Sequence, residues 1–123
     1  MIEKKFNFKD IFVLDLANNH QGSIPHAMKI IDYSHELMEK YNIRVAVKFQ
    51  FRDLPNFVYL NDRQKSENKH VNRFLSTKLD WESYSDLKEY CHNKNLITIC
   101  TPFDEKSVEK IIEMNFDVIK IAS

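Results

Sequence analysis

The chain has 123 residues, of which 43% are apolar and 29% charged, a balance that fits one globular domain and excludes a disordered segment. Its 18 basic residues cancel its 18 acidic residues, and no stretch resembles a membrane span or a secretion signal, so neither nucleic acid nor a membrane is expected as a partner. Cys91 and Cys100 form no C-x-x-C pair, which argues against a zinc site or a disulfide and favours a reduced, cytoplasmic setting.

Residues 11–17 (IFVLDLA) form a short apolar run that predicts a buried strand. The run ends in polar residues before Gly22, which is the only glycine of the chain and indicates a tight turn. Ser23 is a candidate cap for a helix with Pro25 in its first turn. Apolar and small residues then recur at helical spacing and predict the inward stripe of an amphipathic helix: Ala27, Ile30, Ile31, Ser34, Leu37, Met38 and Tyr41.

The same order of elements repeats along the rest of the chain. Further strands are predicted over residues 43–51, 96–101 and 116–123, and an irregular stretch over 52–79. A second helix is predicted over 80–95, with Asp80 as its cap and four residues facing inward: Trp81, Tyr84, Leu87 and Cys91. A third helix is predicted over 104–115, capped by Asp104.

Strands that alternate with helices of this length predict an α/β fold built from parallel βαβ units, because a parallel pair of strands needs a long crossover. Two architectures remain open at this point. One is an open doubly wound sheet, and the other is the first half of an eight-stranded (β/α) barrel. In both, ligands bind at the carboxyl ends of the strands.

Polar residues gather at those carboxyl ends, and we take them as the candidate site: Asp15, Asn19, His20, Lys48, Gln50, Thr101, Asp104, Lys120 and Ser123. Lys48 and Lys120 lie in apolar strands, where an ammonium group needs an anionic partner, so an anionic ligand is indicated. The alternative is that each lysine pairs with a carboxylate such as Asp15 or reaches solvent from the strand end.

Other residues have plainer interpretations. The Asn19-His20 pair is equally well explained by a solvated turn, and Thr101 to Asp104 by a strand end followed by a helix cap. The cysteines are typical of small buried residues. The remaining histidines lack metal-ligand spacing and are expected at the surface: His26, His35, His70 and His92.

Four motifs, NNHQGS, VKFQ, CTPFDE and IKIAS, occur in an order and spacing that resemble the amino-terminal barrel half of the sialic acid synthase family, which includes the pseudaminic and legionaminic acid synthases. The resemblance spans residues 11–123 and implies a (β/α)8 barrel. It also implies a transferase that condenses phosphoenolpyruvate with an N-acetylhexosamine such as N-acetylmannosamine, giving a nine-carbon 2-keto acid and phosphate. The family uses Mn²⁺ or Mg²⁺ as a Lewis acid and is expected to form homodimers.

The resemblance also implies roles for individual residues. Phosphoenolpyruvate is expected at Lys48, Thr101, Lys120 and Ser123, whose two cations and two hydroxyls suit a phosphate and a carboxylate. Gln50 stands where the family contacts the sugar. Asp15 is the candidate catalytic carboxylate, although Asp15-Leu16-Ala17 replaces the family's usual Glu-Ile-Gly, and Asn19 and His20 belong to the loop near the substrate.

The family's metal-binding histidines lie in its second barrel half, so no metal ligand is assigned among residues 1–123. We expect this chain to be one partial barrel domain that ends after the fourth strand and is inactive on its own. Residues 52–79 do not align with the family's usual loop. Two other functions stay open: a class I aldolase that forms a Schiff base on Lys120, and a non-catalytic half-barrel that dimerises and binds an anion.

Overall fold

A computed structural model of the chain describes residues 5–53 and 78–123. Strands and helices alternate along it in the order β1 (Ile11–Asp15), α1 (Ile24–Tyr41), β2 (Arg44–Phe51), α4 (Trp81–Asn93), β3 (Ile97–Pro102), α5 (Glu105–Glu113) and β4 (Val118–Ile119). The predicted irregular stretch 52–79 falls largely outside the described residues, and so does His70.

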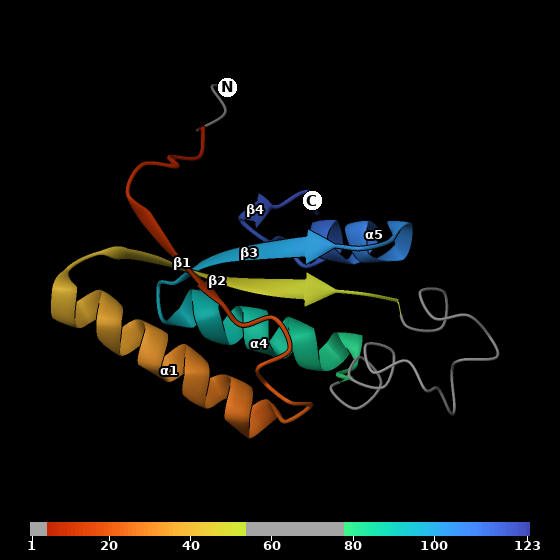
Figure 1. Ribbon diagram of the computed structural model, residues 1–123, viewed down its shortest axis with the longest axis horizontal. Coiled ribbons are helices and arrows are strands. Elements are labelled where there is room, and N and C mark those ends of the chain that lie inside the picture. The colour runs from red at the N-terminus through yellow and green to blue at the C-terminus, as the bar shows by residue number, and fades with distance from the viewer. Residues whose placement is uncertain (1–4, 54–77) are drawn as a thin grey trace.

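The strands form one parallel sheet in the order β1-β2-β3-β4 (Figure 1). This result confirms the predicted α/β fold of parallel βαβ units. A doubly wound sheet reverses its strand order at a switch point, whereas the strands of a (β/α) barrel follow one another in sequence. The observed order therefore belongs to half of an eight-stranded barrel.

Within residues 5–53 and 78–123, α1, α4 and α5 each begin at the cap that the sequence predicts. The Ser23 hydroxyl accepts a hydrogen bond from the backbone N–H of His26 at 3.3 Å. Asp80 and Asp104 each accept one at 2.7 Å through Oδ1, from the third residue after the cap. These contacts satisfy amide groups that have no partner inside the helix, and so they fix where α1, α4 and α5 start.

The hydrophobic core lies between one face of the sheet and the helices. Side chains alternate along β2, so that Val45, Val47, Phe49 and Phe51 pack toward the helices and are almost completely buried. Figure 1 shows α1 and α4 running side by side along the sheet, with α5 beside β3. The opposite face of the sheet carries Lys48 and Gln50, and this face points into the interior of a closed barrel, whose ligands bind at the carboxyl ends of its strands.

The two outer strands are less buried and shorter than predicted. The strand predicted over 11–17 ends at Asp15, and its residues Phe12 and Val13 are 55% and 48% exposed. The strand predicted over 116–123 is confined to Val118–Ile119. Each of these strands pairs with a single neighbour among the described residues, so only one side of each receives a ladder of hydrogen bonds and packing.

The inward stripe predicted for α1 is only partly buried. Ala27, Ile31 and Ser34 are buried as predicted, but Leu37 and Tyr41 are exposed. Tyr41 is the last residue of α1. In the described ranges, 5–53 and 78–123, none of the helices combines the length and the apolar character needed to cross a membrane.

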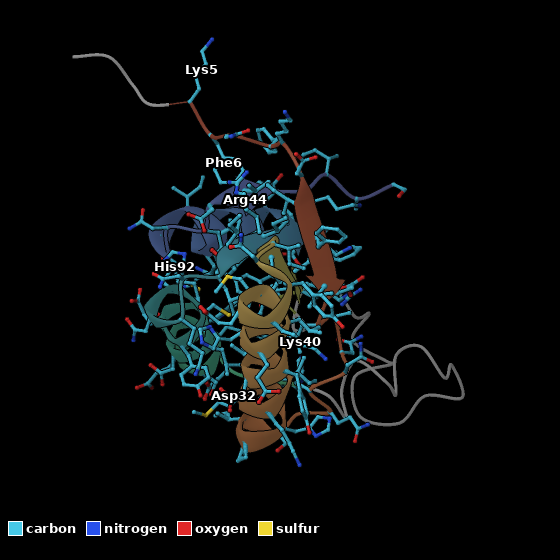
Figure 2. All side chains as sticks on the ribbon, turned by 90° about the vertical axis from the view of Figure 1, so that its left-hand side faces the viewer. Lys5, Phe6, Asp32, Lys40, Arg44 and His92 are labelled. Atoms are coloured by element: carbon cyan, nitrogen blue, oxygen red, sulfur yellow. The ribbon has the colours of Figure 1, made fainter. Side chains whose placement is uncertain are left out.

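The segment before β1 is held by Arg44 at the start of β2 (Figure 2). The Arg44 guanidinium donates from Nη1 to the backbone oxygens of Asn7 and Lys9 at 2.8 and 2.9 Å. Its Cζ atom also lies 5.9 Å from the centre of the Phe6 ring. Arg44 thus fastens the chain at the amino-terminal ends of the strands, away from the candidate site.

Candidate functional site

The sheet register places the candidate residues in two neighbouring rows on the face opposite the helices. Asp15 pairs with Lys48, and Lys48 pairs in turn with Ile99. Two residues further along the strands, Gln50 pairs with Thr101. Lys120 follows β4 directly and extends the ladder, because its backbone N–H donates to the Cys100 oxygen at 3.0 Å.

An open hollow of about 660 Å³ lies on this face of the sheet. Its polar wall consists of Asp15, Lys48 and Lys120, which come from three different strands or strand ends. Its apolar wall is formed by Val13, Ile99, Val118, Ile119 and Ile121. We call this feature the interior hollow, because the corresponding face of a closed barrel points inward.

Lys48 forms an ion pair inside the interior hollow. Its Nζ atom lies 3.1 Å from Asp15 Oδ2, and the lysine side chain is only 15% exposed. The structure therefore contains the alternative that the sequence offered for Lys48, which is a pairing with the Asp15 carboxylate. The pair keeps a charged ammonium stable in a largely buried position, and an anionic ligand at Lys48 would compete with Asp15 for it.

Lys120 differs from the expectation of a lysine buried in a strand. It lies beyond the short β4, is exposed, and donates from Nζ to the Ile121 backbone oxygen at 3.3 Å. The expectation was wrong because β4 lacks a second neighbour among the described residues, which leaves its end open to solvent. Lys120 still lines the interior hollow, whereas Ser123 is exposed and does not.

Thr101 and Gln50 offer neutral polar groups next to the ion pair. Thr101 is 3% exposed, and its Oγ1 atom has no hydrogen-bond partner among the residues that the structure describes. An unpaired hydroxyl in a buried place is unfavourable unless a ligand or water meets it. Gln50 is half-buried and accepts a hydrogen bond at Oε1 from Arg52 Nη2 at 3.1 Å.

The loop between β1 and α1 is a run of tight turns that carries Asn19 and His20. Asn19 is exposed, and its side-chain amide donates to the Asp15 backbone oxygen at 3.2 Å. His20, which a solvated turn would leave in water, is fully buried instead. Its Nδ1 atom accepts the backbone N–H of Gly22 at 3.0 Å, and its Nε2 atom lies 3.4 Å from the Tyr84 hydroxyl.

His20 is held in its neutral form. Because the Gly22 N–H can only donate, Nδ1 carries no proton and Nε2–H faces Tyr84. Burial, with a smaller contribution from the charge of His26, lowers the pKa of His20 to about 4. Burial also raises the pKa of Tyr84 to about 12. His20 is therefore a structural anchor of the loop and does not reach the interior hollow.

Ala17 adopts a left-handed backbone conformation, with φ at 43°. Glycine is usual at this position in the family that the motifs resemble. A side chain in this conformation costs about 1–2 kcal/mol. Ala17→Gly removes this cost but makes the unfolded chain more flexible, which offsets part of the gain. We therefore expect the variant to raise the free energy of unfolding, measured by urea denaturation, by about 0.5–1 kcal/mol. The matched control is Ala27→Gly in the first turn of α1, where the side chain is buried, and this change should lower the free energy of unfolding. A destabilised Ala17→Gly variant would contradict the strain.

Sequence reasoning missed two residues beside the site. Arg52 is the second residue after the VKFQ motif and Phe103 lies within CTPFDE. The two are stacked, with Arg52 Cζ 4.1 Å from the centre of the Phe103 ring. Their closeness to motif residues was the available signal. His92, expected at the surface, is half-buried and lies 3.0 Å from Thr98 Oγ1 and 3.1 Å from Asp117 Oδ2.

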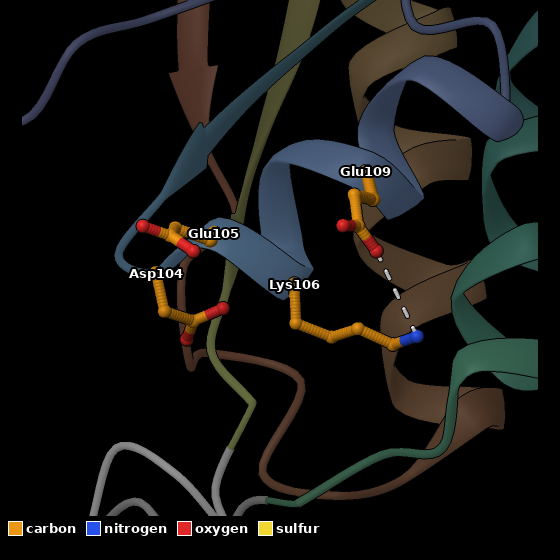
Figure 3. A pocket seen from close by; sticks show the side chains of 4 residues that line it. All are labelled: Asp104, Glu105, Lys106 and Glu109. Carbon is orange, nitrogen blue, oxygen red and sulfur yellow. Dashed lines mark ion pairs between the residues drawn. The ribbon is translucent and has the colours of Figure 1, made fainter.

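A second hollow, of about 410 Å³, lies at the start of α5 (Figure 3). It is lined by Asp104, Glu105, Lys106 and Glu109, and Lys106 pairs with Glu109 at 3.9 Å. Asp104 already caps α5 here.

Throughout residues 5–53 and 78–123, no group of three or more His, Cys, Asp or Glu side chains is arranged to hold a metal ion. Burial raises the pKa of both thiols, that of Cys91 to about 12, so neither cysteine is a ready nucleophile.

Comparison with known proteins gives consistent results. Residues 40–123 match the family model described as the NeuB family. An uncharacterized protein of Methanocaldococcus jannaschii is 30% identical over 105 residues, which are 85% of this chain and 28% of that protein.

Solved structures resemble the chain over almost its whole length. The putative spore coat polysaccharide biosynthesis protein E from Chromobacterium violaceum is 33% identical with a TM-score of 0.88, over 94% of this chain and 34% of that one. The spore coat polysaccharide biosynthesis protein spsE of Bacillus subtilis is 26% identical with a TM-score of 0.62, over 92% of this chain and 29% of that one. The N-acetylneuraminic acid synthetase of Leptospira borgpetersenii, solved with citrate, is 23% identical with a TM-score of 0.68, over 91% of this chain and 35% of that one. At this identity the similarity shows a shared fold. The chain thus spans about a third of the length of these relatives.

Proposed function

Because this chain belongs to the NeuB family, we propose that it supplies the β1–β4 side of the active site of a sialic-acid-type synthase. The proposed reaction condenses phosphoenolpyruvate with an N-acetylhexosamine such as N-acetylmannosamine, and it yields a nine-carbon 2-keto acid and phosphate. The observation that carries the proposal is the placement of Lys48 and Lys120 on one open hollow of about 660 Å³, on the face of the parallel sheet opposite the helices.

The chemistry of these residues suits an anionic enol phosphate. Two ammonium groups on one hollow can neutralise a phosphate and a carboxylate, and charge-assisted hydrogen bonds of this kind are the strong ones. The buried Thr101 hydroxyl can donate to a ligand oxygen, which would satisfy it. Asp15 is the carboxylate of the hollow, and once the ligand takes over Lys48 it is available to accept a hydrogen bond from a hydroxyl of the acceptor.

The resemblance implies a divalent cation, but the described residues include no group of three or more His, Cys, Asp or Glu side chains that could bind one. No step is therefore assigned to it on this chain. The residues on β1–β4 bind and orient phosphoenolpyruvate and one side of the acceptor sugar.

The proposal is tested by titrating the full ¹⁵N-labelled chain with phosphoenolpyruvate and following the amide signals. Saturable shifts are expected at Lys48, Thr101 and Lys120, and Lys48→Met should weaken binding at least tenfold. The matched control is Lys106→Met on α5, whose charge lies outside the interior hollow. Equal affinity in both variants would rule out the assignment. Trapping of a keto acid on Lys120 by borohydride would indicate an aldolase instead.

Thr101→Val should separate ligand binding from stability. The change removes a hydroxyl that has no partner among the described residues, so the free energy of unfolding is expected to stay equal or rise slightly, while phosphoenolpyruvate affinity falls about tenfold. The matched control is Thr98→Val, because the Thr98 hydroxyl is bound to Asp117 at 3.1 Å. That variant should lose about 1–2 kcal/mol of stability and keep its affinity. Calorimetric titration and urea denaturation measure both.

A further inference from the structure

Several contacts between described residues link the carboxyl ends of β2 and β3. The backbone N–H of Phe103 donates to the Phe51 oxygen at 3.1 Å, and the backbone N–H of Asp53 donates to Asp104 Oδ2 at 2.6 Å. Between these two bonds the Arg52 guanidinium lies on the face of the Phe103 ring, 4.1 Å from its centre. The two backbone bonds fix the neighbours of Arg52 in the chain, and the Phe103 ring packs against its guanidinium.

Arg52 in turn fixes the orientation of the Gln50 amide. Its Nη2 atom lies 3.1 Å from Gln50 Oε1. A guanidinium has only donors, so the amide must turn its oxygen toward Arg52. The Gln50 NH₂ group then points away from Arg52. Gln50 therefore meets any bound molecule as a hydrogen-bond donor, and the orientation follows from the chemistry of its neighbour.

We propose that Arg52 is a positioning residue that presents Gln50 as a hydrogen-bond donor to an oxygen atom of the acceptor sugar. This inference rests on the proposed function, in which Gln50 lies on the acceptor side of the site. Gln50 is paired in the sheet with Thr101 and stands one row beyond the Lys48 ion pair, so the donor is placed next to the anion-binding groups. The ligand atom opposite Gln50 is then a hydroxyl or carbonyl oxygen, because an N–H group would meet donors only.

The first measurement concerns the Gln50–Arg52 contact itself and needs no ligand. In the full chain labelled with ¹³C and ¹⁵N, Arg52→Met should shift the Gln50 Cδ resonance, because the hydrogen bond to the carbonyl oxygen is lost while most of the side-chain volume remains. The matched control is Arg44→Met, which removes a guanidinium bound at the other end of β2. A Gln50 Cδ resonance that is the same in Arg52→Met and the parent chain overturns the inference.

The second measurement asks whether the Gln50 NH₂ group meets the acceptor. N-acetylmannosamine is titrated into the chain, and the Gln50 NH₂ signals should move and saturate. Gln50→Glu keeps an oxygen for Arg52 but removes the donors, so it should bind N-acetylmannosamine about tenfold more weakly with an unchanged or higher melting temperature. Arg52→Lys, which keeps the charge but not the planar fork, should recover only part of the affinity lost in Arg52→Met.

The outcomes separate this inference from the proposed function. Unmoved Gln50 NH₂ signals at saturating N-acetylmannosamine, or a Gln50→Glu variant that binds the sugar as well as the parent chain, overturn the role of Gln50 as donor. Failure of phosphoenolpyruvate to shift Lys48 and Thr101 counts against the proposed function. In that case saturable shifts of the Gln50 NH₂ signals with the sugar still support the inference.

Discussion

Replacing Phe51 by alanine is expected to lower the free energy of unfolding by about 3–5 kcal/mol, a large share of the roughly 5–15 kcal/mol that stabilises a typical domain. Phe51 is fully buried at the end of β2. Its ring packs against Tyr84, Trp81 and Phe116, with centroid distances of 4.6, 5.2 and 5.4 Å. Alanine would leave a cavity among three aromatic rings from two other parts of the chain. Urea denaturation followed by circular dichroism measures the loss.

The control for this prediction is Phe12→Ala, the same change on β1, where the ring is 55% exposed. Because little apolar surface is returned to water there, we expect a loss below about 1 kcal/mol. Similar losses in the two variants would show that the aromatic cluster around Phe51 is not the centre of the core.

Acidification is expected to destabilise the chain through His20. Its pKa is about 4 when folded and 6.5 in the unfolded chain, so protons bind the unfolded state more tightly. The stability that neutral His20 contributes is complete above pH 6.5 and is lost as the pH falls toward 4, by which point the accumulated loss is about 3 kcal/mol. Free energies of unfolding measured in urea across this interval should fall with pH.

His20→Gln should remove most of that slope, since glutamine can accept the Gly22 N–H bond without titrating. The comparison variant is His26→Gln, which removes an exposed histidine that adds only the smaller charge effect on His20. It should leave most of the slope in place. If both variants keep the full slope, the acid sensitivity comes from groups other than His20.

The order of strands and helices, the three caps and the family could be predicted because each depends on local or short-range patterns. Asp80 and Asp104 act within one turn of their own helices, and the four motifs that indicated the family lie in sequence at the strand ends. The alternation of apolar residues along β2 likewise needs no knowledge of its partners.

The remaining features depend on contacts between distant residues. His20 is buried beside Tyr84, which is 64 positions away, and no local pattern shows this. The Lys48–Asp15 ion pair, by contrast, is the alternative that the sequence had offered for this lysine. The exposure of Phe12 follows from the place of β1 at the edge of the sheet. The Arg52–Phe103 stack was missed because neither residue belongs to a pattern of its own.

The backbone oxygen of Lys48 accepts two N–H groups, from Leu16 at 3.0 Å and Ala17 at 3.3 Å. One residue thus holds the start of the β1–α1 loop through its main chain and Asp15 through its side chain. The main-chain hydrogen bonds and the side-chain ion pair use different atoms of Lys48. An anion that draws the ammonium away from Asp15 exchanges one counter-ion for another, while the main-chain bonds keep the loop in place. Under the proposed function, ligand capture at Lys48 is a change of electrostatic partners that leaves these main-chain bonds in place.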